Sequence, residues 1–172
     1  MEKKLNRSDI EKYLQMLGQR LLVRGTHADI LVAGGAAIVL LLATRDTTKD
    51  IDAYFSGDVQ ALRTEVEAIA EEYSLREDWL NDGVKGYFYE SNPPQSLWAD
   101  YPGLRVYAVD LDYLLAMKVL AMRDEHDAND AKAVVRQLGL TSPDQVMAIV
   151  QKYIPARLIV QKVYYTVEGL FD

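Results

Sequence analysis

The sequence contains no cysteine and only two histidines in 172 residues. A disulfide framework and a thiolate zinc site are both excluded, because each needs cysteine side chains. His126 lies among acidic residues, but so few histidines and no cysteine disfavour a metal site there. Disulfides are rare in reducing compartments, so the composition is consistent with the cytoplasmic location that we expect.

Long apolar runs are also missing. The longest, residues 36–43, falls far short of the roughly 20 residues that a membrane-spanning helix needs. The N-terminal residues lack the apolar core of a secretory signal peptide. We therefore expect the protein to have no membrane partner.

Positive charge is in deficit. Lysine and arginine number 19 against 26 aspartates and glutamates, which gives a net charge of −7 and a pI near 4.9. Non-specific binding to nucleic acid is driven by cationic surface, so this balance disfavours it. A local basic groove around an acidic metal site remains compatible with the composition.

The most informative stretch surrounds two adjacent glycines, Gly34 and Gly35. A short apolar run at residues 30–33 predicts a buried strand before them. Apolar residues 36–43 predict a short buried helix after them. A polar loop then leads to residues 50–55, whose alternation predicts a second strand. The expected order is therefore strand, glycine turn, helix, loop and strand.

Each part of this stretch has a chemical use. Two glycines let the backbone bend sharply and let a ligand approach closely. The free N–H groups and positive partial charge of a helix N-terminus suit a phosphate. Asp50 and Asp52, two residues apart in a strand, share one face with Cβ atoms roughly 6–7 Å apart. Two such carboxylates suit Mg²⁺, so the pattern predicts phosphoryl or nucleotidyl transfer.

The pattern resembles the nucleotidyltransferase superfamily, the fold of DNA polymerase beta and the tRNA CCA-adding enzymes. Its motif is an apolar strand, Gly-Gly or Gly-Ser, a spacer, and Asp-x-Asp or Asp-x-Glu. Here Gly34-Gly35 and Asp50-Ile51-Asp52 match. Together with Arg45 and Thr47, the local sequence is most similar to a small bacterial branch of this superfamily. That branch includes AbiEii-type toxins of toxin–antitoxin systems and related proteins of unassigned function, and the resemblance continues through residues 79–82 and 114–118.

The resemblance implies a Mg²⁺-dependent enzyme that moves a nucleoside monophosphate from an NTP onto a hydroxyl group. The acceptor would be RNA, such as a tRNA end, or a protein side chain, and a cognate antitoxin is a further expected partner. Asp50 and Asp52 would hold the metal at the catalytic centre, and Gly34 and Gly35 would accommodate the phosphates.

Three basic residues are candidates for contacts with the triphosphate. Arg45 and Lys49 flank the loop before the acidic strand, where the alternative is a solvated loop pair. Lys118 lies in an apolar helical segment and either extends to the surface or reaches the catalytic site. A lysine recurs near this position in similar proteins, which favours a catalytic role for Lys118.

A third carboxylate, which the superfamily usually supplies from a later strand, has no clear position in the sequence. The candidates are Glu90, Asp82, Asp78 and Asp110, and Asp110 is better explained as a helix N-cap. The missing position for a third carboxylate supports an alternative hypothesis, that the protein is a catalytically degenerate domain that binds a nucleotide or a partner protein.

The remaining pattern predicts an α/β (α+β) fold, with a nucleotidyltransferase-like mixed sheet of four or five strands and flanking helices in residues 1–110. A first helix would begin at Ser8, paired with Glu11 in a capping box, and end near Gly25. A second helix would follow Asp58. Further strands are expected at residues 84–89 and 104–109.

Residues 111–172 predict a C-terminal helical portion packed on the core. Helices are expected after Asp110, at residues 128–138, after the N-cap Ser142, and from Pro155 onward. Three tyrosines near the end, Tyr153, Tyr164 and Tyr165, are compatible with a stacking surface for a base. Aromatic residues at helical spacing are more often core.

Overall fold

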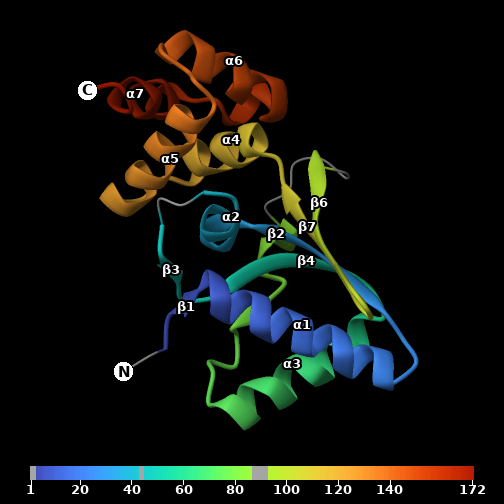
Figure 1. The fold of residues 1–172 in the computed structure, drawn as a ribbon. Helices are drawn as coiled ribbons and strands as arrows, with labels where there is room; N and C mark the ends of the chain where they lie inside the picture. The colour runs from blue at the N-terminus through green and yellow to red at the C-terminus, as the bar shows by residue number, and fades with distance from the viewer. Residues whose placement is uncertain (1–2, 43–44, 87–92) are drawn as a thin grey trace. The chain divides into compact units, whose positions relative to one another are not determined.

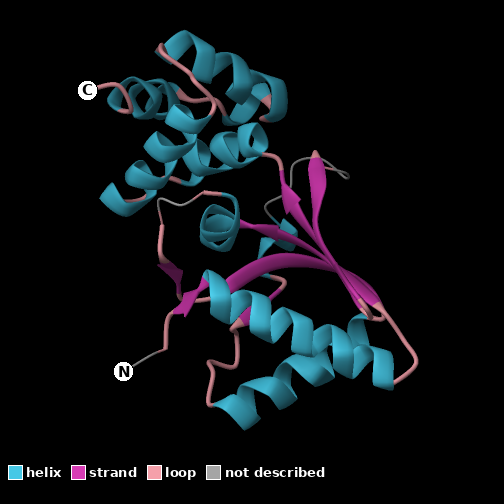
Figure 2. Ribbon diagram, in the orientation of Figure 1, coloured by secondary structure: helices cyan, strands magenta, loops and turns pink. Residues whose placement is uncertain are grey.

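The computed structural model describes residues 3–42, 45–86 and 93–172 (Figure 1). The chain divides into two compact units. One consists of Met1–Tyr87 and Gln95–Ala108, and the other of Phe88–Pro94 and Val109–Asp172. Helices and strands are mixed in the first unit, whereas the second is helical from Leu111 onward (Figure 2). Among the described residues, no helix is both long enough and apolar enough to cross a membrane.

The first unit is built on a five-stranded mixed sheet. Its strands, in spatial order, are β5 (Leu80–Asn81), β4 (Ile51–Gly57), β2 (Ala28–Ala33), β7 (Leu104–Val109) and β6 (Gln95–Tyr101). β2 runs antiparallel to β4 and parallel to β7, and β4 runs parallel to β5. A second small sheet pairs β1 (Leu5–Asn6) with β3 (Thr47–Thr48). These observations confirm the predicted mixed α/β fold.

Helices cover both faces of this sheet. α1 (Arg7–Val23) and α3 (Val59–Tyr73) lie together on one face, and α2 (Gly34–Leu41) lies on the other (Figure 1). β2 is buried almost throughout because both of its faces are covered. β4 alternates instead, burying Ile51, Ala53 and Phe55. Asp52 lies on the opposite face of β4, because successive side chains in a strand point in opposite directions.

The first helix begins two residues earlier than the sequence pattern predicted. Its N-cap is Asn6, whose side chain accepts from the N–H of Asp9 while the Asp9 carboxylate accepts from the N–H of Asn6. The prediction of Ser8 as N-cap was therefore wrong. Pairing of β1 with β3 places Asn6 at the helix start, so Ser8 already lies in the first turn. The predicted end at Gly25, which has a φ of 76°, is confirmed.

Two features of the sheet differ from the prediction. Gly83–Gly86 forms a 3₁₀ helix rather than the start of a strand, and residues 87–89 of that predicted strand lie outside the described residues. β6 had no prediction of its own. Its residues are exposed or half-buried and lack a clear apolar alternation, as expected for a strand at the sheet edge. Pairing with β7, rather than its own pattern, makes it a strand.

The second unit contains α4 (Leu111–Ala121), α5 (Glu125–Gln137), α6 (Pro143–Tyr153), a 3₁₀ turn at Ala156–Leu158 and α7 (Gln161–Gly169). Asp110 and Ser142 occupy the predicted N-cap positions of α4 and α6. α5 begins before residue 128 because Asp124 caps it. The last helix does not start at Pro155, which opens only the short turn.

Candidate functional site

The register of β2 and β4 brings the glycine turn to the acidic pair. Asp52 is paired with Ala33, which is both the last residue of β2 and the N-cap of α2. Asp50 directly precedes β4. The antiparallel pairing therefore places the start of α2 beside Asp52, although residues 36–49 separate the two motifs in sequence.

Gly34 is the residue on which this approach depends. Its φ of 62° lies in the left-handed region, which residues other than glycine rarely adopt. A Cβ atom built on Gly34 would lie 3.3 Å from Asp52 Oδ2. The Asp52 carboxylate thus lies against the backbone at the start of α2. Ala33 supplies no side-chain cap to the first N–H groups of the helix.

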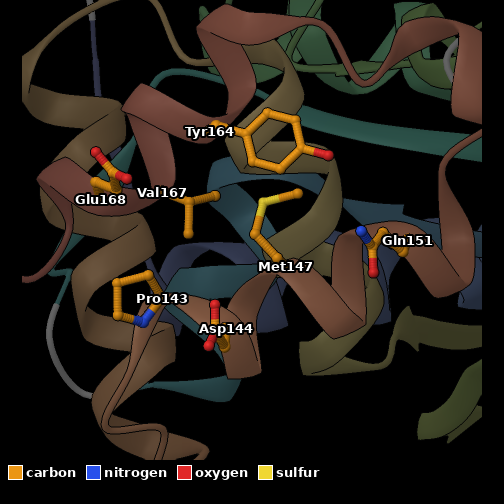
Figure 3. A pocket seen from close by; sticks show the side chains of 7 residues that line it. All are labelled: Pro143, Asp144, Met147, Gln151, Tyr164, Val167 and Glu168. Carbon is orange, nitrogen blue, oxygen red and sulfur yellow. The ribbon is translucent and has the colours of Figure 1, made fainter.

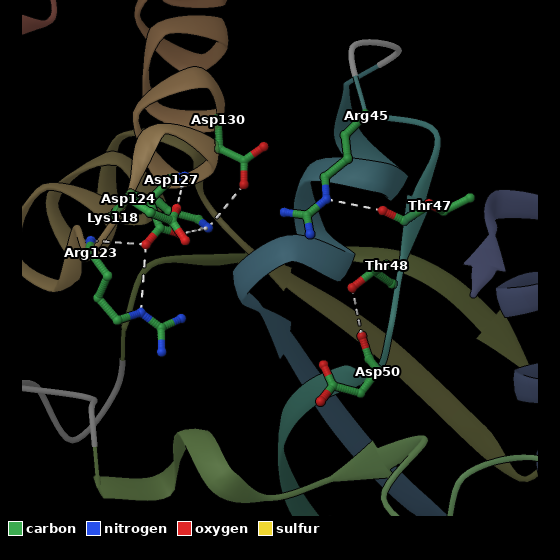
Figure 4. A network of polar contacts seen from close by, with 9 residues as sticks. All are labelled: Arg45, Thr47, Thr48, Asp50, Lys118, Arg123, Asp124, Asp127 and Asp130. Carbon is green, nitrogen blue, oxygen red and sulfur yellow. Dashed lines mark hydrogen bonds and ion pairs between the residues drawn. The ribbon is translucent and has the colours of Figure 1, made fainter. Parts of the chain in front are cut away.

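Arg45 lies over the second glycine. A Cβ atom on Gly35 would come within 2.6 Å of a terminal nitrogen of the Arg45 guanidinium. Arg45 Nε donates to the carbonyl of Thr47 at 3.0 Å, and the Thr48 hydroxyl donates to the carbonyl of Asp50 at 3.0 Å (Figure 4). These bonds hold the loop that carries Arg45 against the strand that carries the acids. Lys49 is exposed on the same loop.

The surroundings of Asp50 oppose its negative charge. Burial raises the pKa of the Asp50 carboxyl, and the carboxylates of Asp52 and Asp78 raise this pKa further. Arg76 and Lys49 act in the opposite direction. A group of close carboxylates whose negative charge is only partly neutralised by nearby basic residues favours the binding of a cation.

The two acids fit a magnesium ion chemically. Mg²⁺ is bound through one or two carboxylates together with substrate phosphates and water. Asp50 and Asp52 supply such oxygen donors, and the start of α2 beside them offers N–H donors for phosphate. Within residues 3–42, 45–86 and 93–172, no group of three or more His, Asp or Glu side chains is placed to hold a metal ion.

The predicted candidates for a third carboxylate have other roles or lie outside the described residues. Asp78 forms an ion pair with Arg76 at 2.8 Å, and Asp82 pairs with Arg63 of α3. Glu90 lies outside the described residues. Asp110 occupies the N-cap position of α4.

Lys118 belongs to the second unit, where it joins α4 to α5 (Figure 4). Its Nζ lies 3.0 Å from Asp130 Oδ2 and 3.4 Å from Asp127 Oδ1. All three side chains are largely buried, with Asp130 only 7% exposed. The alternative in which Lys118 extends to the surface is wrong, because its side chain is only 13% exposed, and its catalytic role stays a prediction.

Arg76 near Asp50 was not anticipated from the sequence, whereas Asp78 was one of the candidates for the third carboxylate. Ile51 donates its N–H to the carbonyl of Trp79 at 2.7 Å, and this strand pairing brings the segment around Trp79 to Asp50. No local pattern encodes a parallel pairing between such short segments, so the sequence could not choose Asp78 among the four candidates or indicate Arg76.

The mixed α/β fold and the joined glycine and acid motifs are those of the nucleotidyltransferase superfamily. A family model described as "Nucleotidyltransferase of unknown function (DUF6036)" matches residues 11–152. The chain therefore belongs to this family of nucleotidyltransferases of unknown function.

Two further comparisons give little detail. No curated protein matches the sequence. Among solved structures, an antigenic nucleotidyltransferase-like protein from Paracoccidioides brasiliensis is similar over 98% of this chain and 89% of its own. Its sequence is 11% identical and the TM-score is 0.49.

Proposed function

We propose that this protein is a Mg²⁺-dependent nucleotidyltransferase that moves a nucleoside monophosphate from an NTP onto a hydroxyl group of RNA or protein. The observation that carries the proposal is the contact between the start of α2 and the acidic strand. There the Asp52 carboxylate lies 3.3 Å from the Cβ position of Gly34. A phosphate-binding helix start and a cation-binding acid in contact are what a metal–triphosphate complex requires.

In this proposal each residue of the first unit has a defined task. Asp50 and Asp52 hold the magnesium ion, which when bound would neutralise charge on the phosphates of the NTP. Gly34 and Gly35, which have no side chains, would accommodate the phosphates next to the Asp52 carboxylate and the Arg45 guanidinium. Arg45, already held against Gly35, supplies positive charge next to that position.

In the proposed transfer the acceptor hydroxyl releases its proton to solvent water and its oxygen forms a bond to the α-phosphorus, while the bond from the α-phosphorus to the pyrophosphate oxygen breaks. Arg45 would stabilise the negative charge that remains on the pyrophosphate. Asp50 and Asp52 are half-buried, Asp50 directly before β4 and Asp52 within it, so little reorganisation is needed when the nucleotide binds.

A second candidate function is a degenerate domain that binds a nucleotide or a partner protein without catalysis. One observation favours it: in the parts of the chain that the structure describes, no third acidic side chain completes a metal site with the pair. A toxin role in the cytoplasm, with a cognate antitoxin as partner, is a narrower version of the enzyme proposal and rests on sequence resemblance alone.

The experiment is a transfer assay with each of the four α-³²P-labelled NTPs and Mg²⁺, with and without total tRNA. The test variant is Asp50→Ala/Asp52→Ala. The control variant is Glu67→Ala/Glu71→Ala, which removes the same charge from exposed positions on α3.

Label on RNA or protein that disappears in the test variant and persists in the control variant would establish the transferase and its acceptor class. Nucleotide binding without label in any reaction would favour the degenerate domain. Label that persists in the test variant would refute the assignment of the acidic pair.

A further inference from the structure

We propose that the groove between α6 and α7 binds a basic segment of a partner protein, with an arginine side chain seated in the groove. This inference concerns only the second unit and does not rest on the proposed transferase activity. The groove has a volume of about 310 Å³. Its α7 wall lies C-terminal to residues 11–152, the part matched by the family model.

The groove combines an apolar floor with polar edges (Figure 3). Met147 of α6 and Val167 of α7 form the floor and are 8% and 0% exposed. The edges are formed by Asp144 and Gln151 of α6 and by Tyr164 and Glu168 of α7. On α6, Asp144, Met147 and Gln151 are spaced by three and four positions, and on α7, Tyr164 lies three and four positions before Val167 and Glu168, so each helix presents one stripe to the groove.

The charge of the lining is of one sign. Asp144 and Glu168 are acidic, and no lysine or arginine lines the groove. Across residues 3–42, 45–86 and 93–172, neither carboxylate forms an ion pair or a side-chain hydrogen bond. Other acids of the second unit, such as Asp112 and Asp130, are engaged by Tyr153 and Lys118. The two groove carboxylates are thus available to a cationic ligand.

The groove matches an arginine side chain better than other groups. The aliphatic part of arginine can pack on the exposed part of Met147, next to the fully buried Val167, while its planar guanidinium donates to carboxylates. Tyr164, which is 40% exposed, adds an aromatic face of the kind that attracts guanidinium groups. A phosphate or nucleic-acid ligand would face repulsion from Asp144 and Glu168.

Binding can be tested with two fluorescent peptides added to the full-length protein. One contains arginine and leucine in alternation, and the other replaces each arginine by neutral citrulline. Methyl and amide NMR shifts of Met147, Tyr164 and Val167 report the site. We expect shifts with the arginine peptide only, and an affinity that falls as salt is raised.

Matched variants test the groove itself. Glu168→Gln and Asp144→Asn should each weaken binding on the order of threefold, as expected for a partly exposed charge pair. Glu67→Gln, which removes an exposed charge on α3, should leave binding unchanged. Tyr164→Ala should weaken binding, whereas Tyr165→Ala, at a neighbour that does not line the groove, should not.

Several results would overturn the proposal. These are equal binding of the citrulline peptide, equal losses in the control variants, or no binding of the arginine peptide. Self-association that Tyr164→Ala abolishes would instead identify the groove as a contact between copies of the chain. Asp50→Ala/Asp52→Ala should bind the peptide normally, so failure of the transferase proposal is distinguishable from failure of this one.

Discussion

The Asp50 carboxylate lies in surroundings that destabilise its charged form. Burial and the nearby carboxylates of Asp52 and Asp78 raise its pKa. Within the described parts of the chain its side chain forms no hydrogen bond or ion pair. Such a group contributes little to folding stability, in agreement with the cation-binding role that we propose for it.

We therefore expect Asp50→Asn to raise the melting temperature of the metal-free protein at neutral pH, because it removes a repelled charge without breaking a hydrogen bond. The same variant should lose the stabilisation that Mg²⁺ and an NTP give to the wild type. Thermal unfolding in EDTA and in Mg²⁺ with NTP measures both effects. A lower melting temperature in EDTA would show that the carboxylate has a structural role.

Gly34 has two requirements at once, a left-handed backbone and space for Asp52. Gly34→Ala should lose roughly 1–2 kcal/mol of unfolding free energy from the backbone alone. It should lose more because the added methyl group would lie 3.3 Å from Asp52 Oδ2. Urea denaturation measures the loss, and titration with Mg²⁺ and NTP measures binding.

Gly25→Ala is the control for that prediction. Gly25 has a φ of 76°, but a Cβ atom there would meet nothing within 4 Å. It should show the backbone loss without a change in nucleotide affinity. Equal effects of the two substitutions on nucleotide affinity would argue against a binding site at the start of α2.

The first helix offers a test of how its start is determined. Asn6 caps α1 in the structure, whereas the sequence pattern favoured Ser8. Asn6→Ala should therefore lose about 1 kcal/mol of unfolding free energy. Ser8→Ala should change it by only a few tenths, since Ser8 is exposed within the first turn. Urea denaturation of both variants measures these losses. A larger loss of unfolding free energy in Ser8→Ala than in Asn6→Ala would identify Ser8 as the N-cap.

The contact between α4 and α5 should depend on pH. The pKa of Asp127 is lowered although burial opposes this, because the Arg123 N–H and Lys118 stabilise its carboxylate. A lowered carboxyl pKa adds stability above the ordinary value of 3.8, and this stability is lost as pH falls through the folded-state pKa.

Asp127→Asn should thus lose about 1.5–3 kcal/mol at neutral pH, the range for hydrogen bonds to a charged group. The difference from the wild type should shrink as the pH falls below 4. Urea denaturation across that pH range is the measurement. A difference that stays constant with pH would mean that the charge of Asp127 contributes nothing.

Elements with a strong local pattern were predicted well. The run after Gly35 has no polar residue up to the loop, and it forms α2. Leu104–Val109 alternates and forms β7 with the predicted limits. Elements without such a pattern were not predicted: β6 depends on its pairing with β7, and β5 has only two residues, which pair with β4. Propensity is weak at that length, so tertiary contacts decide.

The charge of the whole protein limits how it can meet nucleic acid. With a net charge of −7, the protein should not bind non-specific single-stranded RNA measurably at about 0.15 M salt, where cationic contacts dominate such binding. A gel-shift titration with poly(U) measures this. If the acceptor is a tRNA, its binding should require specific features of that RNA. Strong binding to poly(U) would show a basic surface that the net charge conceals.

Much of the candidate site could be inferred from neighbours in the chain. The periodicity of apolar residues, the adjacent glycines and the Asp-x-Asp spacing depend on residues close in sequence, and they predicted the strands, the helix and the acid pair. Those features were enough to indicate the superfamily, and the match of the family model agrees.

The arrangement of those parts depends on contacts between residues far apart in the chain. The register that puts Asp52 beside Gly34, the position of Arg45 over Gly35 and the approach of Asp78 to Asp50 all arise from packing. Lys118 shows the same limit. Its apolar segment left open an extension to the surface or a reach toward the catalytic site, and in the structure two carboxylates of α5 contact it. A buried charge is stabilised by whichever opposite charge the fold brings near, and spacing along the chain does not specify that partner.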